Sequence, residues 1–366
     1  MKKRILVLIT TEAAGGAERI ILAQMKYFNK NKFELHVVTL EKGYLESAFS
    51  NNHAHYFCLD SKREISLTAI KKLLWYVRKY KIDLVHTHLY RPDIYGFIIK
   101  LMIPRIKLIT TKHNTNNFRK KIYWGLLDKI LSIPASQIIA VSQSVKKFIS
   151  KYEFIPLERI KVIYHGVDIS KFKRKINLTR LSKQLGIKNK DFVIGIVGRI
   201  SEQKGHKYLF EAVAQLKNKI PCIRLLVIGV GELKEEMEQY TRDLCITDSV
   251  TFLGFRSDLA ELYSLMDVLC LPSIFEGLGL VLIEAMLCNT ITVGAKIHGI
   301  EEIISDGVNG FLFPPRDSNV LAKIIYRIYQ SNFDKKLISR AKLTALQFDF
   351  KKNLKNIEKL YLDTLS

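Results

Sequence analysis

Two glutamates on either side of a glycine-rich turn are the first candidates for chemistry. Residues 275–286 read FEGLGLVLIEAM, which places Glu276 before the turn and Glu284 eight residues later. The apolar run 268–271 predicts a buried strand before the turn, and a helix is expected after it. Glycines bring backbone N–H groups close to a ligand, and a helix N-terminus favours anions. The pattern suits a ligand with hydroxyls and phosphates; an acid/base pair or two solvated glutamates are the alternatives.

A second glycine loop follows another apolar run. Residues 198–205 read GRISEQKG and come directly after the predicted strand 192–197. The loop matches neither GxxxxGK[ST] nor GxGxxG. It carries Arg199, which can bind two phosphate oxygens at once, and Lys204, which supplies a point charge. Together they could neutralise a pyrophosphate without a metal, unless they are two ordinary surface cations.

Three weaker signals lie in the first half of the chain. Gly15 and Gly16 follow the first predicted strand, and they either admit a ligand to the backbone or simply form a turn. His113 ends a strand-like run at residues 108–112. His86 and His88 share one face of a strand, but a zinc site would need further ligands, and none has suitable spacing. The sequence also contains no Asp-x-Asp pair, so no metal is expected.

The composition indicates a globular protein of two domains. The chain has 366 residues, of which 48% are hydrophobic and 25% charged, and this length favours two cores. Its five cysteines are scattered without a CxxC pair, which is typical of reduced thiols in a cytosolic protein. The basic start followed by the apolar residues 5–9 is too short for a signal peptide and predicts a first strand. No apolar stretch reaches the roughly 18 residues of a membrane span, so a soluble or peripheral protein is expected.

Positive charge is concentrated in the first half. Residues 1–175 hold 33 Lys+Arg against 13 Asp+Glu, a net charge of +20 out of +23 for the whole chain. No nucleic-acid-binding signature accompanies this charge, so anionic lipid or a phosphate-bearing acceptor is the expected partner. The stretches 71–79 (KKLLWYVRK) and 118–127 (FRKKIYWGLL) mix cations with aromatics. Each suits a membrane surface, or else is a helix with a solvated basic face.

Strands and helices alternate along the whole chain, which predicts mostly parallel sheets with helices on both faces. The irregular, lysine-rich segment 167–189 indicates a boundary, so we expect domains at 1–170 and 176–345 and a final helix at 346–366. In such sheets, ligands bind beyond the carboxyl ends of the strands. The predicted strands are residues 5–10, 35–40, 56–59, 84–88, 108–111, 138–141, 160–163, 192–197, 224–228, 250–253, 268–271, 291–294 and 310–313.

Five motifs, taken together and in order, resemble glycosyltransferase family 4. They are GGAE at 15–18, GRISEQKG at 198–205, VTFLGF at 250–255, the two glutamates 276 and 284, and EIISDGVNGFL at 302–312. The resemblance covers essentially the whole chain. It implies an α/β fold of the GT-B type, in which two Rossmann-like domains face each other across a deep cleft. The last helix would cross back to the first domain.

The resemblance also implies roles for individual residues. Arg199 and Lys204 would bind the pyrophosphate of a nucleotide-sugar donor, and Glu284 the ribose. Glu276 would face the transferred sugar, and His113 would lie at that sugar from the opposite domain. The remaining implied donor-binding residues are Gly15, Gly16, Phe255, Arg256, Leu278, Gly279, Leu280 and Val281. The family transfers sugars with retention of configuration and without a metal.

Three segments depart from the family pattern: His165 replaces the usual Asn before Gly-Val-Asp, Gly229-Val230-Gly231 replaces Gly-Asp-Gly, and residues 298–302 read HGIEE. We predict a retaining, metal-independent glycosyltransferase that moves a hexose or N-acetylhexosamine from a nucleotide sugar, a UDP-sugar by preference, to a lipid-linked or oligosaccharide acceptor. The product would be a cell-surface polysaccharide (capsule, O-antigen or exopolysaccharide), made by a cytoplasmic enzyme on the inner face of an anionic membrane. The alternatives are a sugar-nucleotide epimerase of the same fold and a non-catalytic polyanion- or lipid-binding protein.

Overall fold

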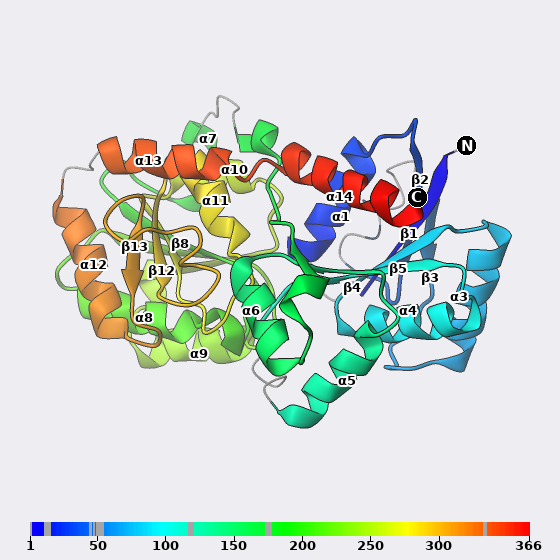
Figure 1. The fold of residues 1–366 in the computed structure, drawn as a ribbon. Helices are drawn as coiled ribbons and strands as arrows, with labels where there is room; N and C mark the ends of the chain where they lie inside the picture. Colours follow the sequence, from blue (N-terminus) through cyan, green and yellow to red (C-terminus); the bar gives the residue numbers. More distant parts are fainter. Residues whose placement is uncertain are drawn as a thin grey trace. The chain divides into compact units, whose positions relative to one another are not determined.

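A computed structural model describes residues 2–10, 16–43, 46, 48, 55–115, 121–172, 178–331 and 335–366. The chain forms two compact units (Figure 1). The first unit comprises Met1–Gly166 and Phe350–Ser366, and the second comprises Val167–Asp349. Each unit has its own sheet and its own hydrophobic core.

The first unit contains a seven-stranded parallel sheet in the order β3-β2-β1-β4-β5-β6-β7. The strand order reverses between β1 and β4, and such a switch point opens a crevice at the carboxyl ends of the strands. The strands are β1 Lys3–Ile9, β2 Phe33–Thr39, β3 His55–Cys58, β4 Leu84–His88, β5 Lys107–Lys112, β6 Gln137–Ala140 and β7 Ile160–Val162.

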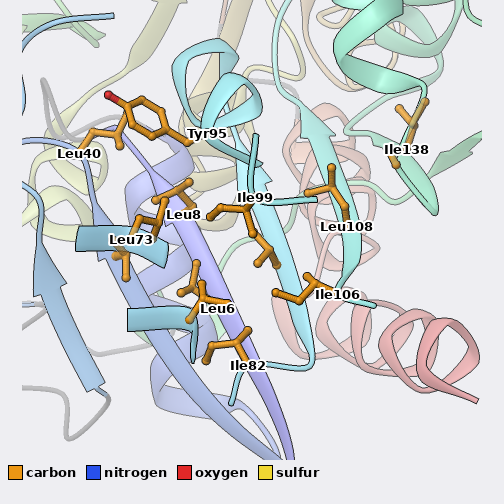
Figure 2. Packing of buried hydrophobic residues seen from close by; sticks show 14 of the residues in the cluster. Leu6, Leu8, Leu40, Leu73, Ile82, Tyr95, Ile99, Ile106, Leu108 and Ile138 are labelled. Atoms are coloured by element: carbon orange, nitrogen blue, oxygen red, sulfur yellow. The ribbon is translucent and has the colours of Figure 1, made fainter. Parts of the chain in front are cut away.

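Helices cover both faces of this sheet, because the reversal of strand order sends the crossover connections to opposite faces. Figure 2 shows the core on one face, where Leu73 of α3 and Tyr95 and Ile99 of α4 lie beside Leu8 of β1 and Leu108 of β5. Helix α3 contacts α4, and α4 contacts α5. The helices of this unit are α1 Gly16–Tyr27, α3 Leu67–Lys79, α4 Tyr90–Met102, α5 Ile122–Ser132, α6 Gln143–Tyr152 and α14 Phe350–Leu365.

The last helix, α14, packs on α1 of the first unit (Figure 1). The ring of Tyr361 on α14 lies 5.9 Å from that of Phe28 and 6.1 Å from that of Phe33, centroid to centroid. Glu358 accepts a hydrogen bond from the backbone N–H of Asn29 at 2.8 Å. The predicted return of the C-terminal helix to the first domain is thus confirmed.

The second unit contains a six-stranded parallel sheet in the order β10-β9-β8-β11-β12-β13. Its strand order reverses between β8 and β11, the two strands that precede the glycine loops. The strands are β8 Phe192–Val197, β9 Ile223–Ile228, β10 Val250–Gly254, β11 Val268–Leu271, β12 Ile291–Ala295 and β13 Phe311–Phe313. The helices are α7 Leu178–Leu185, α8 His206–Leu216, α9 Lys234–Asp243, α10 Leu259–Leu265, α11 Leu280–Leu287, α12 Ser318–Gln330 and α13 Lys335–Leu346.

One segment differs from the expectation. The sequence predicted irregular structure for residues 167–189, but residues 178–185 form the amphipathic helix α7. Its only buried side chain is Leu181, and α7 packs on α10 within the second unit. With a single buried residue over two turns, the apolar periodicity was too short to predict a helix.

Candidate functional site

The two predicted motifs of the second unit meet at the carboxyl ends of β8 and β11. Glu276, in the loop after β11, is only 6% exposed. Its Oε1 atom accepts a hydrogen bond from Ser273 Oγ at 3.0 Å and forms an ion pair with Lys204 Nζ from the loop after β8. The adjacent parallel strands therefore place a cation from one motif on the carboxylate of the other.

Backbone contacts hold these two loops together. The backbone N–H of Ile274 donates to the carbonyl of Gln203 at 2.8 Å, and Gln203 Nε2 donates to the carbonyl of Phe275 at 3.0 Å. Gly205 has φ 65°, and a Cβ atom there would lie 2.2 Å from the carbonyl oxygen of Pro272. Only glycine fits such a position. The loops after β8 and β11 therefore form one closely packed layer at the edge of the sheet.

Glu284 has a different environment on helix α11. It is 8% exposed, and its Oε2 accepts a hydrogen bond from Tyr263 OH of α10 at 2.6 Å. Gly279 caps α11 in the left-handed region, with φ 62°. Leu278 before it is buried, while Leu280 and Val281 in the first turn are half-buried. The start of α11 and the Glu284 carboxylate thus lie on the same short helix.

The other donor-binding candidates of this unit occupy the same sheet edge. Arg199 follows β8 and is exposed. Arg256 follows the edge strand β10 and binds Asp258 with both Nε–Oδ1 (2.8 Å) and NH2–Oδ2 (2.5 Å) contacts. This hydrogen-bonded pair lowers the pKa of Asp258. Phe255 is 39% exposed beside it. Loops after three strands thus present cations and an aromatic ring along one edge.

Several neighbours of this site were not predicted. Gln203 lies inside the predicted loop, and Ser273 lies between β11 and the glycine turn, so position alone could have suggested both. Tyr263 gives no sequence signal, because an aromatic in a short helix usually packs in the core. Gly299 also belongs to the site: at φ 91°, a Cβ atom there would lie 2.7 Å from the carbonyl oxygen of Glu276.

In the first unit, His113 directly follows β5 and lies between two other histidines. Its Nε2 lies 2.9 Å from His88 Nδ1, and its Nδ1 lies 3.0 Å from His165 Nε2. His86 Nδ1 lies 2.5 Å from Tyr361 OH, and its Nε2 lies 2.7 Å from the hydroxyl of Thr111. Burial lowers the pKa of His113 to about 4 and also lowers the pKa values of His86, His88 and His165. At neutral pH, His113 is therefore a neutral imidazole with both ring nitrogens hydrogen-bonded.

The histidines around His113 do not form a metal chelate. The two nitrogens of His113 face different imidazoles, so the three rings do not converge on one point. Among the described residues, possible metal-ligand atoms gather within 4.8 Å of one another only at Glu34, His36 and His55. The rings of His36 and His55 are stacked 4.4 Å apart at 12°, and Glu34 Oε1 lies 3.1 Å from His36 Nε2 and 3.3 Å from His55 Nε2.

The diglycine candidate is only partly described. Gly15 lies outside the described residues, and Gly16 is the first residue of α1. Its predicted contact with the donor stays a prediction.

The fold and the clustered loops define a class of protein. Two parallel α/β units, with candidate site residues at the carboxyl ends of their strands and a last helix returned to the first unit, are the architecture of GT-B glycosyltransferases. The chain belongs to glycosyltransferase family 4: residues 14–171 match the family model described as Glycosyltransferase Family 4, and residues 178–344 match Glycosyl transferases group 1.

Known proteins similar to this chain are sugar-transferring enzymes. It is 26% identical over 370 residues to the Escherichia coli UDP-Gal:alpha-D-GlcNAc-diphosphoundecaprenol alpha-1,3-galactosyltransferase, covering 95% of this chain and 94% of that one. It is 22% identical to a Campylobacter jejuni 4-alpha-N-acetylgalactosaminyltransferase that acts on a diphospho-undecaprenol glycan, covering 94% and 95%. The crystal structure of Anabaena HepE with UDP and glucose superimposes with a TM-score of 0.89 at 26% identity, covering 99% and 100%. The chain is a glycosyltransferase.

No helix in the described part of the chain combines the length and the apolar character needed to cross a bilayer.

Proposed function

We propose that this glycosyltransferase moves a hexose or N-acetylhexosamine from a UDP-sugar to a lipid-linked glycan, with retention of configuration and without a metal. The observation that carries this proposal is the meeting of Glu276, Lys204 and Ser273 beside the start of α11. That arrangement places a carboxylate, a cation and a helix N-terminus at one sheet edge. The carboxylate can accept hydrogen bonds from sugar hydroxyls, and the cation and the helix N-terminus can bind donor phosphates.

The donor would lie along the edge formed by the loops after β8 and β11. Glu284, which Tyr263 fixes, would accept hydrogen bonds from the ribose hydroxyls. Arg199 is exposed and would bind the pyrophosphate, and Lys204 would share its charge between Glu276 and the phosphate. Phe255 and Arg256 after β10 would flank the base.

The reaction would depend more on stabilising the negative charge of the leaving group than on proton transfer. Negative charge develops on the departing UDP phosphate, and fixed cations and backbone N–H groups lower the energy of that charge. Arg199, Lys204 and the first turn of α11 would supply them. Because Lys204 and Ser273 already hold the Glu276 carboxylate, Glu276 would orient the sugar hydroxyls instead of attacking the anomeric carbon.

The proposed acceptor is a lipid-linked glycan in surface-polysaccharide assembly. Support comes from the names of the Escherichia coli and Campylobacter jejuni relatives, both of which act on diphosphoundecaprenol-linked sugars. UDP as the nucleotide is supported by the name of the first relative and by the UDP complex of HepE. The product would belong to a capsule, an O-antigen or an exopolysaccharide.

The first unit would bring the enzyme to the inner face of the membrane. It holds 33 Lys+Arg against 14 Asp+Glu, a net charge of +19, whereas the second unit holds 25 against 21, or +4. Helix α3 exposes Trp75 among four cations: Lys71, Lys72, Arg78 and Lys79. Cations bind anionic headgroups, and tryptophan favours the membrane interface. We propose peripheral binding through the face that carries α3 and α5.

Replacing Glu276 with alanine tests the transfer reaction. The full chain is incubated with individual UDP-sugars and membrane lipid extract, and UDP release and the glycolipid product are measured. Loss of the orienting carboxylate should lower kcat/KM by about 100-fold. Glu238→Ala, which removes a surface carboxylate on α9, is the matched control and should leave the rate unchanged.

Three outcomes would overturn the proposal. Unchanged transfer by the Glu276→Ala variant would remove Glu276 from the mechanism. Conversion of the sugar without any acceptor would identify an epimerase, and the absence of turnover with every donor would favour a non-catalytic binding protein.

A further inference from the structure

Three histidines of the first unit form a hydrogen-bonded chain in which His88 and His165 have no role assigned so far. The chain runs from His88 through His113 to His165, with nitrogen–nitrogen distances of 2.9 and 3.0 Å. The ring of His86 lies 4.2 Å from that of His88, and Tyr361 of α14 holds His86 from the other side. His88 of β4 and His165 after β7 thus hold the ring of His113, which follows β5, and α14 reaches this chain through His86.

The hydrogen bonds couple the tautomers of the three linked rings. A neutral imidazole has one N–H donor and one acceptor nitrogen. Because both nitrogens of His113 are engaged, a proton on its Nδ1 requires His165 Nε2 to accept and His88 Nδ1 to donate. A proton on its Nε2 reverses both hydrogen bonds. The chain therefore has two neutral arrangements.

The buried end of the chain distinguishes these arrangements. His88 is 1% exposed, and its Nε2 has no hydrogen-bond partner among the residues that the structure describes. If His113 donated to His88 Nδ1, His88 would carry its proton on Nε2 as a buried, unpaired N–H. Buried donors are left unpaired less often than buried acceptors. The favoured arrangement has protons on Nδ1 of His88 and Nδ1 of His113, and His165 accepts.

The charged groups around the chain do not protonate it. Asp93 is the carboxylate whose charge acts on His113, and it is ion-paired with the buried Lys112 at 3.1 Å. His86, the remaining titratable ring nearby, is neutral because burial lowers its pKa to about 3. Thr111 and Tyr361 occupy both of its nitrogens. Neither Asp93 nor His86 therefore supplies a proton that would change the neutral arrangement of the three histidines.

We propose that His88 and His165 are positioning residues that hold His113 in one orientation and in its Nδ1–H tautomer. This proposal rests on the proposed function in one respect: His113 would lie at the transferred sugar, as the family resemblance implies. His113 then presents a neutral ring in a fixed orientation and does not transfer a proton to the substrate. His165, which stands where the family usually has Asn, is the acceptor end of this chain.

Nitrogen NMR of the full chain, labelled with ¹⁵N-histidine, tests the tautomer without any sugar. We expect His113 to carry its proton on Nδ1 and to stay neutral down to about pH 5. In His165→Leu the acceptor is lost, so the tautomers should mix. In His165→Gln the amide oxygen can accept near the original Nε2 position, so the Nδ1–H form should return. His55→Leu removes a half-exposed imidazole of β3 and should change nothing at His113.

Steady-state kinetics then distinguish a positioning role of His165 from a contribution to folding stability alone. We expect His165→Leu to lower kcat at least tenfold with little change in the donor KM, and His165→Gln to recover most of it. An Nε2–H tautomer in the wild type, or full kcat in a leucine variant with mixed tautomers, would overturn the proposal. A locked Nδ1–H tautomer in a chain that transfers no sugar would count against the proposed function alone.

Discussion

Glu276 and Glu284 lie on one sheet edge but have different hydrogen-bond donors. Glu276 is held by a lysine and a serine, and Glu284 by the phenol of Tyr263. An acid/base pair would need both carboxylates to reach the same reacting group of the substrate, one to donate a proton and the other to accept one. The observed partners instead fix each carboxylate as an acceptor at its own position, which suits the recognition of two separate sets of hydroxyls.

Tyr263→Phe tests the role of Glu284 at the scale of one residue. The change removes the 2.6 Å hydrogen bond to Glu284 and leaves the ring in place. A hydrogen bond to a charged group contributes about 1.5–3 kcal/mol. We therefore expect the UDP-sugar KM to rise about tenfold, with kcat nearly unchanged, in steady-state kinetics.

Tyr240→Phe is the matched control for this prediction. Tyr240 donates to Glu211 at 2.8 Å between α9 and α8, so the same chemical group is lost from a tyrosine–glutamate pair outside the candidate site. Its donor KM should equal that of the wild type. Equal KM values for the two variants would show that Glu284 does not bind the donor.

The sequence identified charged site residues better than it identified their neighbours. Arg199, Lys204 and Glu276 follow apolar strands and accompany glycines, and these local signals do not depend on the rest of the fold. Tyr263 is eight residues or more from any such motif and reaches Glu284 through helix packing. The chain of His88, His113 and His165 likewise depends on the parallel register of β4 and β5.

At the scale of elements, a buried ion cluster joins three helices to the end of β5. Lys112 is 4% exposed, and its Nζ lies 3.1 Å from Asp93, 3.1 Å from Asp128 and 3.3 Å from Glu153. These carboxylates belong to α4, α5 and the C-cap of α6. Because His113 follows Lys112 directly, the cluster also fixes the backbone that carries His113, the middle residue of the histidine chain.

Lys112→Met should strongly destabilise the first unit. The substitution keeps an unbranched side chain of similar length but leaves three buried carboxylates without their cation, and breaking a buried pair costs about 3–5 kcal/mol. Urea unfolding at pH 7 measures this loss. Lys234→Met removes an exposed i,i+4 pair with Glu238 and should cost less than about 1 kcal/mol. Similar losses for the two variants would show that the cluster does not stabilise the unit.

The alternation of strands predicted both sheets because buried parallel strands are continuous apolar runs. Helices were predicted less completely than strands, and α4 was not predicted. Helix α4 begins at Tyr90 with Pro92 in its first turn and contains Gly96, so its sequence resembles a loop. A Cβ atom at Gly96 would lie 2.5 Å from the methyl group of Thr87. Close packing on β4 therefore selects a residue that weakens the local helix signal.

At the scale of the whole molecule, charge and exposed apolar side chains coincide in the first unit. Helix α5 exposes a stripe spaced three or four residues apart: Ile122, Leu126, Ile130 and Ile133. Lys121 and Lys129 are exposed on the same helix. The first part of the predicted basic stretch, residues 118–120, lies outside the described residues. An apolar helical stripe with flanking cations is the pattern of an interfacial helix.

Vesicle sedimentation of the full chain tests this surface. The wild type should pellet with vesicles that contain anionic phospholipid, and binding should weaken as salt screens the +19 charge of the first unit. The double change Leu126→Glu and Ile130→Glu removes two inserted side chains, each contributing about 1.5–3 kcal/mol when fully buried, so the partition should fall at least about tenfold. Leu343→Glu alters an even more exposed leucine on α13 of the second unit and should bind like the wild type. If wild type and double variant sediment equally with anionic and neutral vesicles, the apolar stripe is a solvated surface and the enzyme reaches its lipid-linked acceptor by another route.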